Sequence, residues 1–384
     1  MANTLTDLIP DALEALDIVS REMTGFIPAV KRDTEANRAA IGETVRFPIA
    51  PAESSADNTP GVNAPDTGDA VIGSDTLAIT KSKHVPVRWN GEETLATQRK
   101  GIYSTINADR LAQAFRTLTN EIETDLGALF TNCSRAYGTA GTTPSGTAGE
   151  LDDFAGVNEI LDVNGAPKDG RQLVLDHSAI SNMRGKQNTL FNVNEAGSSD
   201  MLRTGMTDLV QNLAIRQSGQ VATHTAGTAT GFDITTGFSV GDETLTVDGS
   251  DAGTILAGDI VTWAGDGNKY MVVSSTASGS ASGNIVIQPI GLRAAAGVGV
   301  EGTLQGDYTA NMAFSQDAIV LATRMPAAPE GGDMATDVTQ IQDPYSGLIF
   351  ELAQYKQYLQ NVIHVRIAWG VKAVKPAHMA LLLG

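Results

Sequence analysis

The chain has 384 residues and a formal net charge of −18, from 26 Lys and Arg against 44 Asp and Glu. That balance argues against a protein whose main task is to grip nucleic acid or an anionic membrane, because both need basic side chains to meet phosphate. A single cysteine, Cys133, excludes an intrachain disulfide and a cysteine-rich zinc site. The chain shows neither a secretory signal nor an uninterrupted apolar run of membrane-spanning length, so we expect it to be cytosolic where it is made.

The first part of the chain predicts an arm followed by a long loop. Apolar residues at spacings of three and four from Leu5 to Val19 indicate an amphipathic helix, which ends before Gly25 and Pro28. Residues 43–91 predict an extended two-stranded loop, because two runs with strand character flank a middle rich in Asn, Asp, Pro and Gly. An isolated hairpin is marginally stable, so this loop should lean on other structure.

Basic residues concentrate on this loop. They are Arg46, Lys81, Lys83, His84 and Arg88. A solvated arm is the simplest interpretation, and contact with an acidic patch on another copy of the chain is the main alternative, given the surplus of carboxylates. DNA binding is the weakest interpretation, since a few positive charges do not offset a net charge of −18. We therefore take these five residues as candidate assembly contacts.

A long helix is predicted over residues 107–131. Asn107 is its expected N-cap and Asp109 lies in the first turn, where the helix dipole favours an anion. At 1.5 Å per residue the helix should extend over about 37 Å. Its apolar side chains form one stripe, made of Leu111, Phe115, Leu118, Ile122, Leu126 and Leu129.

The next segment alternates helix, turn, strand and helix, which predicts a mixed α+β domain. We expect a helix at 154–161, a turn at 164–167, a strand at 172–175 and a helix capped by Asp176.

The composition changes at residues 221–310, which hold 16 of the 40 glycines and nine acidic residues against Lys269 and Arg293. Several short strands separated by Gly, Asp and Ser predict a small β sandwich or barrel. Apolar strands resume at 317–329, 347–358 and 361–374, so the β module is inserted into the α+β body. Because local turns join its strands, we expect residues 223–307 to fold on their own.

Two strings match catalytic motifs but lack the required context. Residues 237–241 read G-F-S-V-G, like a nucleophile elbow with Ser239 as nucleophile, but a strand is predicted to follow where the motif needs a helix. Residues 297–302 match G-x-G-x-x-G without the strand–turn–helix setting of a dinucleotide site. The first is interpreted as a β-turn of the module and the second is not a cofactor site. No catalytic residue and no cofactor is expected.

Other chemistry-bearing residues have structural interpretations. Asp176, His177 and Ser178 are neighbours that point in different directions, unlike a triad assembled by the fold. The five histidines show no metal-site spacing, so no metal is expected. The acidic turns at 248–251 and 266–268 have oxygen ligands for a weakly bound calcium ion, but solvated turns are favoured.

Taken together, these elements resemble the major capsid (coat) proteins of tailed bacteriophages, which have the Hong Kong 97-type fold. The resemblance rests on the order of arm, extended loop, long helix, helix–turn–strand segment, inserted β module and closing strands. The segment NGAPKDGRQLVLDHSAI and the stretch from Asp343 to Leu382, with Gly370 and Pro376, are similar to segments of these proteins. The module looks like the insertion domain of the branch typified by a short-tailed Salmonella phage.

This resemblance implies a noncatalytic shell subunit that forms the hexamers and pentamers of an icosahedral head. Its implied partners are other copies, a scaffolding protein and a portal, with binding of a decoration protein left open, and the head encloses double-stranded DNA without reading its sequence. The implied location is the virion capsid, after assembly in the host bacterial cytoplasm. The implied divisions are an N-terminal arm at 1–42, an extended loop at 43–91, a peripheral domain at 92–175 with a spine helix at 107–131, the first part of an axial domain at 176–222, an inserted β domain at 223–307 and closing axial and peripheral strands at 308–384.

Three other classes remain open. An encapsulin-like compartment shell shares the implied fold, although the insert and the chain length favour a virus. A β-rich serine hydrolase would use Ser239. A surface adhesin or carbohydrate-binding module centred on 221–310 would be expected to carry a secretion signal, which is not seen.

Overall fold

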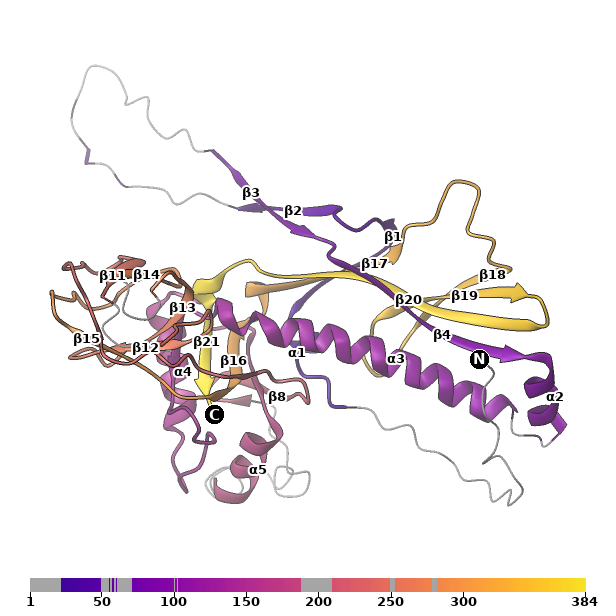
Figure 1. Ribbon diagram of the computed structural model, residues 1–384, viewed down its shortest axis with the longest axis horizontal. Helices are drawn as coiled ribbons and strands as arrows, with labels where there is room; N and C mark the ends of the chain where they lie inside the picture. Colours follow the sequence, from indigo (N-terminus) through magenta and orange to yellow (C-terminus); the bar gives the residue numbers. More distant parts are fainter. Residues whose placement is uncertain are drawn as a thin grey trace.

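A computed structural model describes residues 22–49, 55, 57–58, 60, 71–99, 101, 103–187, 209–248, 253–277 and 282–384. The molecule is elongated, and helix α3 (Tyr103–Gly127) runs along its long axis (Figure 1). A six-stranded and a thirteen-stranded sheet lie toward opposite ends, and a two-stranded hairpin projects from the body. The helix predicted from Leu5 to Val19 lies outside the described residues.

The six-stranded sheet is organised around its longest strand, β20. One edge of β20 pairs with β4, and the other pairs with β19 and then with β17. Helix α3 covers one face, where Trp89 and Trp369 share a buried core with Leu118. The strands are β1 (Lys31–Ala39), β4 (Lys81–Asn90), β17 (Ile319–Pro326), β18 (Asp337–Gln342), β19 (Ile349–Gln357) and β20 (Gln360–Ala373). The predicted closing strands are thus confirmed.

The predicted long helix is present but begins four residues early. Helix α3 spans Tyr103–Gly127 and continues as a 3-10 turn, η1 (Ala128–Asn132). Asn107 therefore lies inside the helix and is not its N-cap, and Asp109 lies beyond the first turn. The side chain of Asn107 is used elsewhere, because its Oδ1 accepts a hydrogen bond from Trp89 Nε1 at 3.0 Å. The apolar stripe is correct: Leu118, Ile122 and Leu126 are buried, and its other members pack against the same core.

The extended loop divides into two parts. Strands β2 (Thr44–Ile49) and β3 (Gly73–Ala78) form the projecting hairpin, while β4 belongs to the six-stranded sheet, so the second half of the predicted loop is part of the body. The base of the hairpin crosses β20 at Gly370. A Cβ atom there would lie 2.1 Å from the carbonyl oxygen of Ala78, so only glycine permits this close crossing.

The second sheet combines body strands with the strands of the insert. Helices α4 (Asp152–Val163) and α5 (His177–Lys186) pack beside it, and Asp176 caps α5 as predicted by accepting the Ser178 N–H at 3.0 Å. The strands are β5 (Arg135–Tyr137), β6 (Arg171–Leu175), β7 (Leu209–Val210), β8 (Leu213–Gln217), β9 (Thr223–His224), β10 (Phe232–Asp233), β11 (Thr244–Val247), β12 (Ile260–Trp263), β13 (Lys269–Ser275), β14 (Gly283–Ile287), β15 (Glu301–Leu304), β16 (Tyr308–Ser315) and β21 (Met379–Leu383).

The insert has its predicted strands and a core of its own, but its strand pairing is not purely local. Residues such as Leu245, Val261 and Ile285 form a separate buried cluster. Strand β13 also pairs with the body strand β5, and Ile260 and Met271 belong to the main core. A three-residue body strand thus extends the insert's sheet at this edge, and independent folding of residues 223–307 stays a prediction.

Candidate functional site

Two of the five candidate assembly residues form ion pairs within the chain. Lys81 Nζ lies 2.7 Å from Asp125 Oδ1 on α3, and this hydrogen bond raises the pKa of Lys81 above its ordinary value. Lys83 pairs with Glu121 of the same helix. The two lysines therefore tie α3 to β4 in the monomer, and a role between copies stays a prediction.

The other three candidates lie away from α3. His84 and Arg88 point to the opposite face of β4, because side chains alternate along a strand and Val87 and Trp89 face the core. The ring of His84 stacks on that of His364, with 4.6 Å between ring centroids. Arg46 is exposed on the projecting hairpin. The structure thus separates the five residues onto three surfaces and does not join them in one patch.

The histidine pair predicts a loss of stability in mild acid. Burial first, and then the charges of His84 and Arg366, lower the pKa of His364 below its ordinary value of 6.5. A base with a depressed pKa in the folded state binds its proton more tightly when unfolded, so stability that is present above pH 6.5 is lost as the pH falls from that value through the lower pKa of the folded state. Tyr355 contacts the His364 ring edge-on, and Arg366 is itself paired with Asp333 and Glu351.

Melting temperatures measured across this pH range should fall in acid for the wild type and fall less for His364→Phe. His177→Gln, on the exposed end of α5, serves as a control and should keep the wild-type slope. An unchanged slope in His364→Phe would assign the acid sensitivity to other groups.

A buried joint near the C-terminal end of α3 was not predicted. Glu123 is 0% exposed, and its carboxylate accepts the backbone N–H groups of Gly25, Phe26 and Ile27 at 3.3, 3.1 and 2.8 Å. It also accepts the hydroxyl of Ser218 at 2.8 Å. Burial raises the pKa of Glu123, although all four hydrogen bonds act in the opposite direction. One side chain thus fastens helix α1 (Phe26–Ala29) and the segment after β8 to α3.

A second carboxylate fixes the same N-terminal segment from the solvent side. Glu22 accepts hydrogen bonds from Arg116 Nε at 2.7 Å and Asn120 Nδ2 at 2.6 Å, both on α3. The hydrogen bond from Arg116 is the main reason that the pKa of Glu22 falls to about 2. No spacing in the sequence relates residues 22 and 123 to these partners, which explains why neither was recognised.

The catalytic strings lack their required settings in the structure too. Ser239 lies in a turn that leads to strand β11, and its backbone N–H donates to Asp242 Oδ2 at 2.7 Å. Residues 297–302 lead into strand β15, so no helix N-terminus faces a phosphate. Asp266 is occupied by Asn268 N at 3.0 Å and the hydroxyl of Tyr270 at 2.5 Å, while residues 249–252 lie outside the described part of the chain.

Two kinds of feature are absent from the described residues. No group of three or more His, Cys, Asp or Glu side chains among them is arranged to hold a metal ion. No helix among them combines the length and apolarity needed to cross a membrane.

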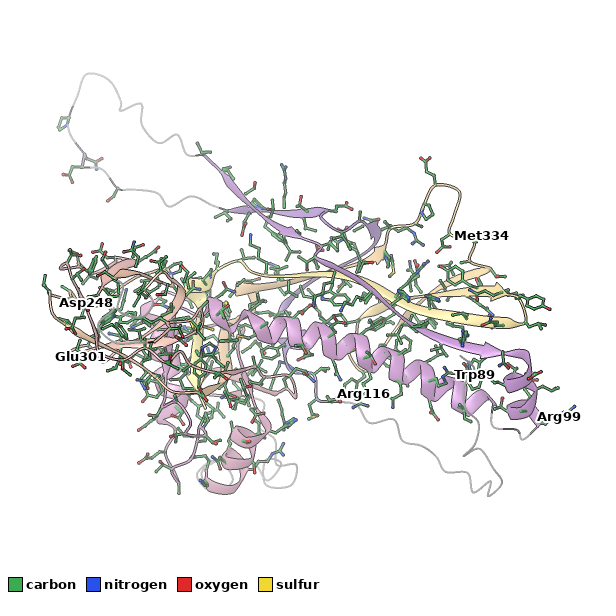
Figure 2. All side chains as sticks on the ribbon, viewed as in Figure 1. Trp89, Arg99, Arg116, Asp248, Glu301 and Met334 are labelled. Carbon is green, nitrogen blue, oxygen red and sulfur yellow. The ribbon has the colours of Figure 1, made fainter. Side chains whose placement is uncertain are left out.

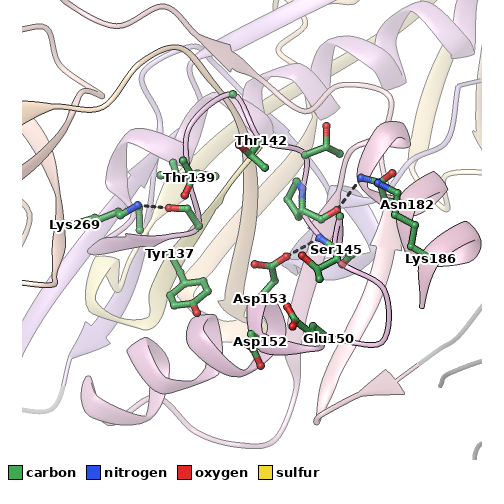
Figure 3. A pocket seen from close by; sticks show the side chains of 18 of the residues that line it. Tyr137, Thr139, Thr142, Ser145, Glu150, Asp152, Asp153, Asn182, Lys186 and Lys269 are labelled. Atoms are coloured by element: carbon green, nitrogen blue, oxygen red, sulfur yellow. Dashed lines mark hydrogen bonds between the residues drawn. The ribbon is translucent and has the colours of Figure 1, made fainter. Parts of the chain in front are cut away.

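A cavity of about 920 Å³ opens where the insert meets the body (Figure 3). Its lining is polar, and several of its groups brace the loop between β5 and α4. Asp153 Oδ2 accepts the N–H of Ser145 at 2.6 Å, and Lys269 Nζ donates to the carbonyl oxygen of Gly138. Among its described lining residues there is no histidine, and none of their hydroxyl groups is hydrogen-bonded to a general base.

Comparison with known proteins identifies the fold. No protein-family model matches the chain, and no curated protein matches it. A chain in the capsid structure of the cyanophage P-SCSP1u is 12% identical, with 100% of this chain and 95% of that chain covered and a TM-score of 0.51. A structure from the Mycobacterium phage Che8 is 11% identical, with 99% and 98% covered and a TM-score of 0.47. The chain therefore has a mixed α+β capsid-protein fold, shared over its whole length with the cyanophage chain.

Proposed function

We propose that this protein is the major capsid protein of a tailed bacteriophage, a noncatalytic subunit of an icosahedral head that holds double-stranded DNA. The full-length match to the cyanophage capsid structure, at a TM-score of 0.51, carries the proposal. The physical properties of the chain support it. A net charge of −18 lets a shell enclose DNA without adhering to it, and the projecting hairpin gives the subunit reach toward its neighbours.

The finer assignment is the Hong Kong 97-type fold, in the branch with an inserted β domain. In this proposal α3 is the spine helix, and the insert spans 223–307. The change of sheet after α3 supports moving the boundary of the peripheral domain from 175 to about residue 127, because β5 and β6 pair with β21 and β16. The partners in this proposal are other copies in hexamers and pentamers, a scaffolding protein and a portal. The subunit assembles in the host bacterial cytoplasm and resides in the virion capsid.

Electron microscopy of the purified protein tests the proposal. The chain, expressed with and without a scaffolding partner, should give closed shells or ring-shaped capsomers, and Ser239→Ala should give the same particles. A monodisperse monomer or dimer under every assembly condition would contradict the proposal.

Arg46 offers a direct test of the hairpin as an assembly element. It is exposed on β2, and no ion pair or hydrogen bond of its side chain is seen among the described residues. Arg46→Glu should therefore lower the yield of shells while leaving the melting temperature of the unassembled chain within about 1 °C of wild type, as expected of a surface change. Arg46→Lys, which keeps the charge, is the matched control. Equal shell yields for Glu and Lys would remove Arg46 from the assembly contacts.

The isolated insert tests the assigned boundaries. Residues 223–307 should give a circular dichroism spectrum of strand with almost no helix and a cooperative melt. Stability should be modest, because the edge of β13 and the side chains of Ile260 and Met271 lose their body partners. Covering that edge with the body should raise the melting temperature of the same strands in the full chain. A disordered or helical spectrum would refute the boundary.

A further inference from the structure

We propose that the two ends of the molecule bind each other between copies: the tip formed by α2 and the β19–β20 turn docks on the outer acidic face of the insert of a second copy. This inference adds a specific contact to the proposed shell function and rests on it for its setting.

The acidic face of the insert is the surface around the paired strands β10 and β15, where Asp233, Asp248 and Glu301 lie. Asp233 on β10 stands directly opposite Glu301 on β15, which places two like charges across one strand pair. Directly opposed like charges destabilise a sheet, and a cation from outside relieves that cost. Asp248 adjoins them, since its Oδ1 accepts the N–H of Asp233 at 2.8 Å. The face therefore carries a negative charge, and the basic residues of the insert do not neutralise it.

Both basic residues of the insert belong to its inner side. Lys269 donates to the carbonyl oxygen of Gly138 at the seam with the body. The backbone N–H of Arg293 donates to the hydroxyl of Tyr270 at 2.9 Å, and Tyr270 stands opposite Arg135 of the body strand β5, so Arg293 lies at the seam as well. Neither one is therefore turned to the acidic face.

Apolar side chains accompany the carboxylates on the acidic face. Val240 is 59% exposed and Val298 is 71% exposed, in two turns that flank the bridge between Phe238 and Ala296. Exposed carboxylates of Glu243 and Glu301 lie on the same two segments. The face thus combines an apolar centre with an acidic margin.

The tip at the other end of the molecule also has exposed apolar side chains at its centre, but its charged neighbours are mainly basic. The two-residue turn between β19 and β20 is Tyr358–Leu359, and these side chains are 86% and 72% exposed. Leu359 has a φ of 54°, a left-handed conformation usually given to Gly or Asn in such turns. A large apolar residue in a costly conformation, left exposed, points to a contact made outside the monomer.

Helix α2 (Gly91–Arg99) lies against this turn, since the N–H of Gly91 donates to the carbonyl oxygen of Leu359 at 3.0 Å. It adds exposed Leu95 and Arg99, and Lys356 lies just before the turn. Of the two carboxylates on α2, Glu93 is buried and Glu92 is exposed. The tip therefore presents an apolar centre with mainly basic neighbours.

Position makes this contact intermolecular. Arg99 lies at one extreme of the long axis, while Asp248 and Glu301 lie at the other (Figure 2). Two tips repel each other, as do two acidic faces, so like charge disfavours the symmetric pairings and favours tip-to-insert docking. Such a head-to-tail contact builds a ring or closed array when its rotation closes.

Disulfide trapping tests the contact directly. Protein with Tyr358→Cys is mixed with protein carrying Val298→Cys, and the mixture is oxidised. The native Cys133 does not interfere because it is buried. The mixed disulfide should form several-fold more than with Val163→Cys, an exposed residue at the end of α4, and its yield should fall in high salt. Equal yields for Val298→Cys and Val163→Cys would overturn the inference.

Charge reversal gives a second, independent test. Lys356→Glu with Arg99→Glu, or Glu243→Lys with Glu301→Lys, should each weaken association measured by sedimentation velocity, and the chain with all four changes should recover it. A four-change chain that associates as poorly as either parent would overturn the inference. If closed shells form but the mixed disulfide between Tyr358→Cys and Val298→Cys does not, only this inference fails. If the mixed disulfide forms but no closed particle does, the proposed function fails and the contact stands.

Discussion

Glu123→Ala is expected to lower the free energy of unfolding by about 3–5 kcal/mol, the range seen when one partner of a buried charged network is removed. The substitution leaves three backbone N–H groups and the Ser218 hydroxyl without their acceptor in a site that is closed to solvent. Each buried donor left unpaired costs about 1–3 kcal/mol, and partial relaxation keeps the total below the simple sum. Urea unfolding followed by circular dichroism measures the change.

Glu121→Ala is the matched control for this result. Glu121 lies two residues earlier on α3 and pairs with lysines at the solvent edge, so its loss should cost about 1 kcal/mol or less. Limited proteolysis should then cut the segment around residues 22–30 faster in Glu123→Ala than in Glu121→Ala. Equal stability of the two variants would show that the joint does not hold the N-terminal segment.

Leu118→Asp should destabilise the chain by about 4 kcal/mol or more, because it buries an unpaired carboxylate and removes a core side chain. Leu118 is 1% exposed and packs in the main core between α3 and the six-stranded sheet. The preceding residue, Thr117, is exposed, so Thr117→Asp should stay within about 0.5 kcal/mol of wild type. Soluble yield and urea unfolding of the pair measure the difference. Similar losses from both would mean that the assigned buried face of α3 is wrong.

The sequence predicts the buried face of α3 well, but it does not predict the contacts that Glu123 makes from this helix to distant segments of the chain. A 3.6-residue repeat depends only on local side chains, and the stripe from Leu111 to Leu129 was readable for that reason. Glu123 follows the stripe residue Ile122, where a carboxylate normally indicates a solvated helix surface. Its partners lie about 95 residues away in both directions along the chain, and only the folded structure brings them to it.

In the loop and the insert, too, the sequence indicates where strands form but not which strands pair with each other. The second run of the predicted loop is extended as expected, yet its pattern does not specify a pairing partner. Ten of its residues pair with β20, so that part of the run belongs to the body. The insert strands were readable from their local turns. Strand β5 has only three residues, Arg135–Tyr137, which is too short for a pattern, so its pairing with β13 was not foreseen.

That pairing has a mechanical consequence. In the sheet β5 lies between β13 and β21, and along the chain it follows α3 and η1 almost directly. A load applied to the insert is therefore carried by backbone hydrogen bonds into the end of α3 and the centre of the body, and does not stretch the two connecting strands alone. A displacement of the insert is therefore transmitted to the longest helix of the subunit through β5.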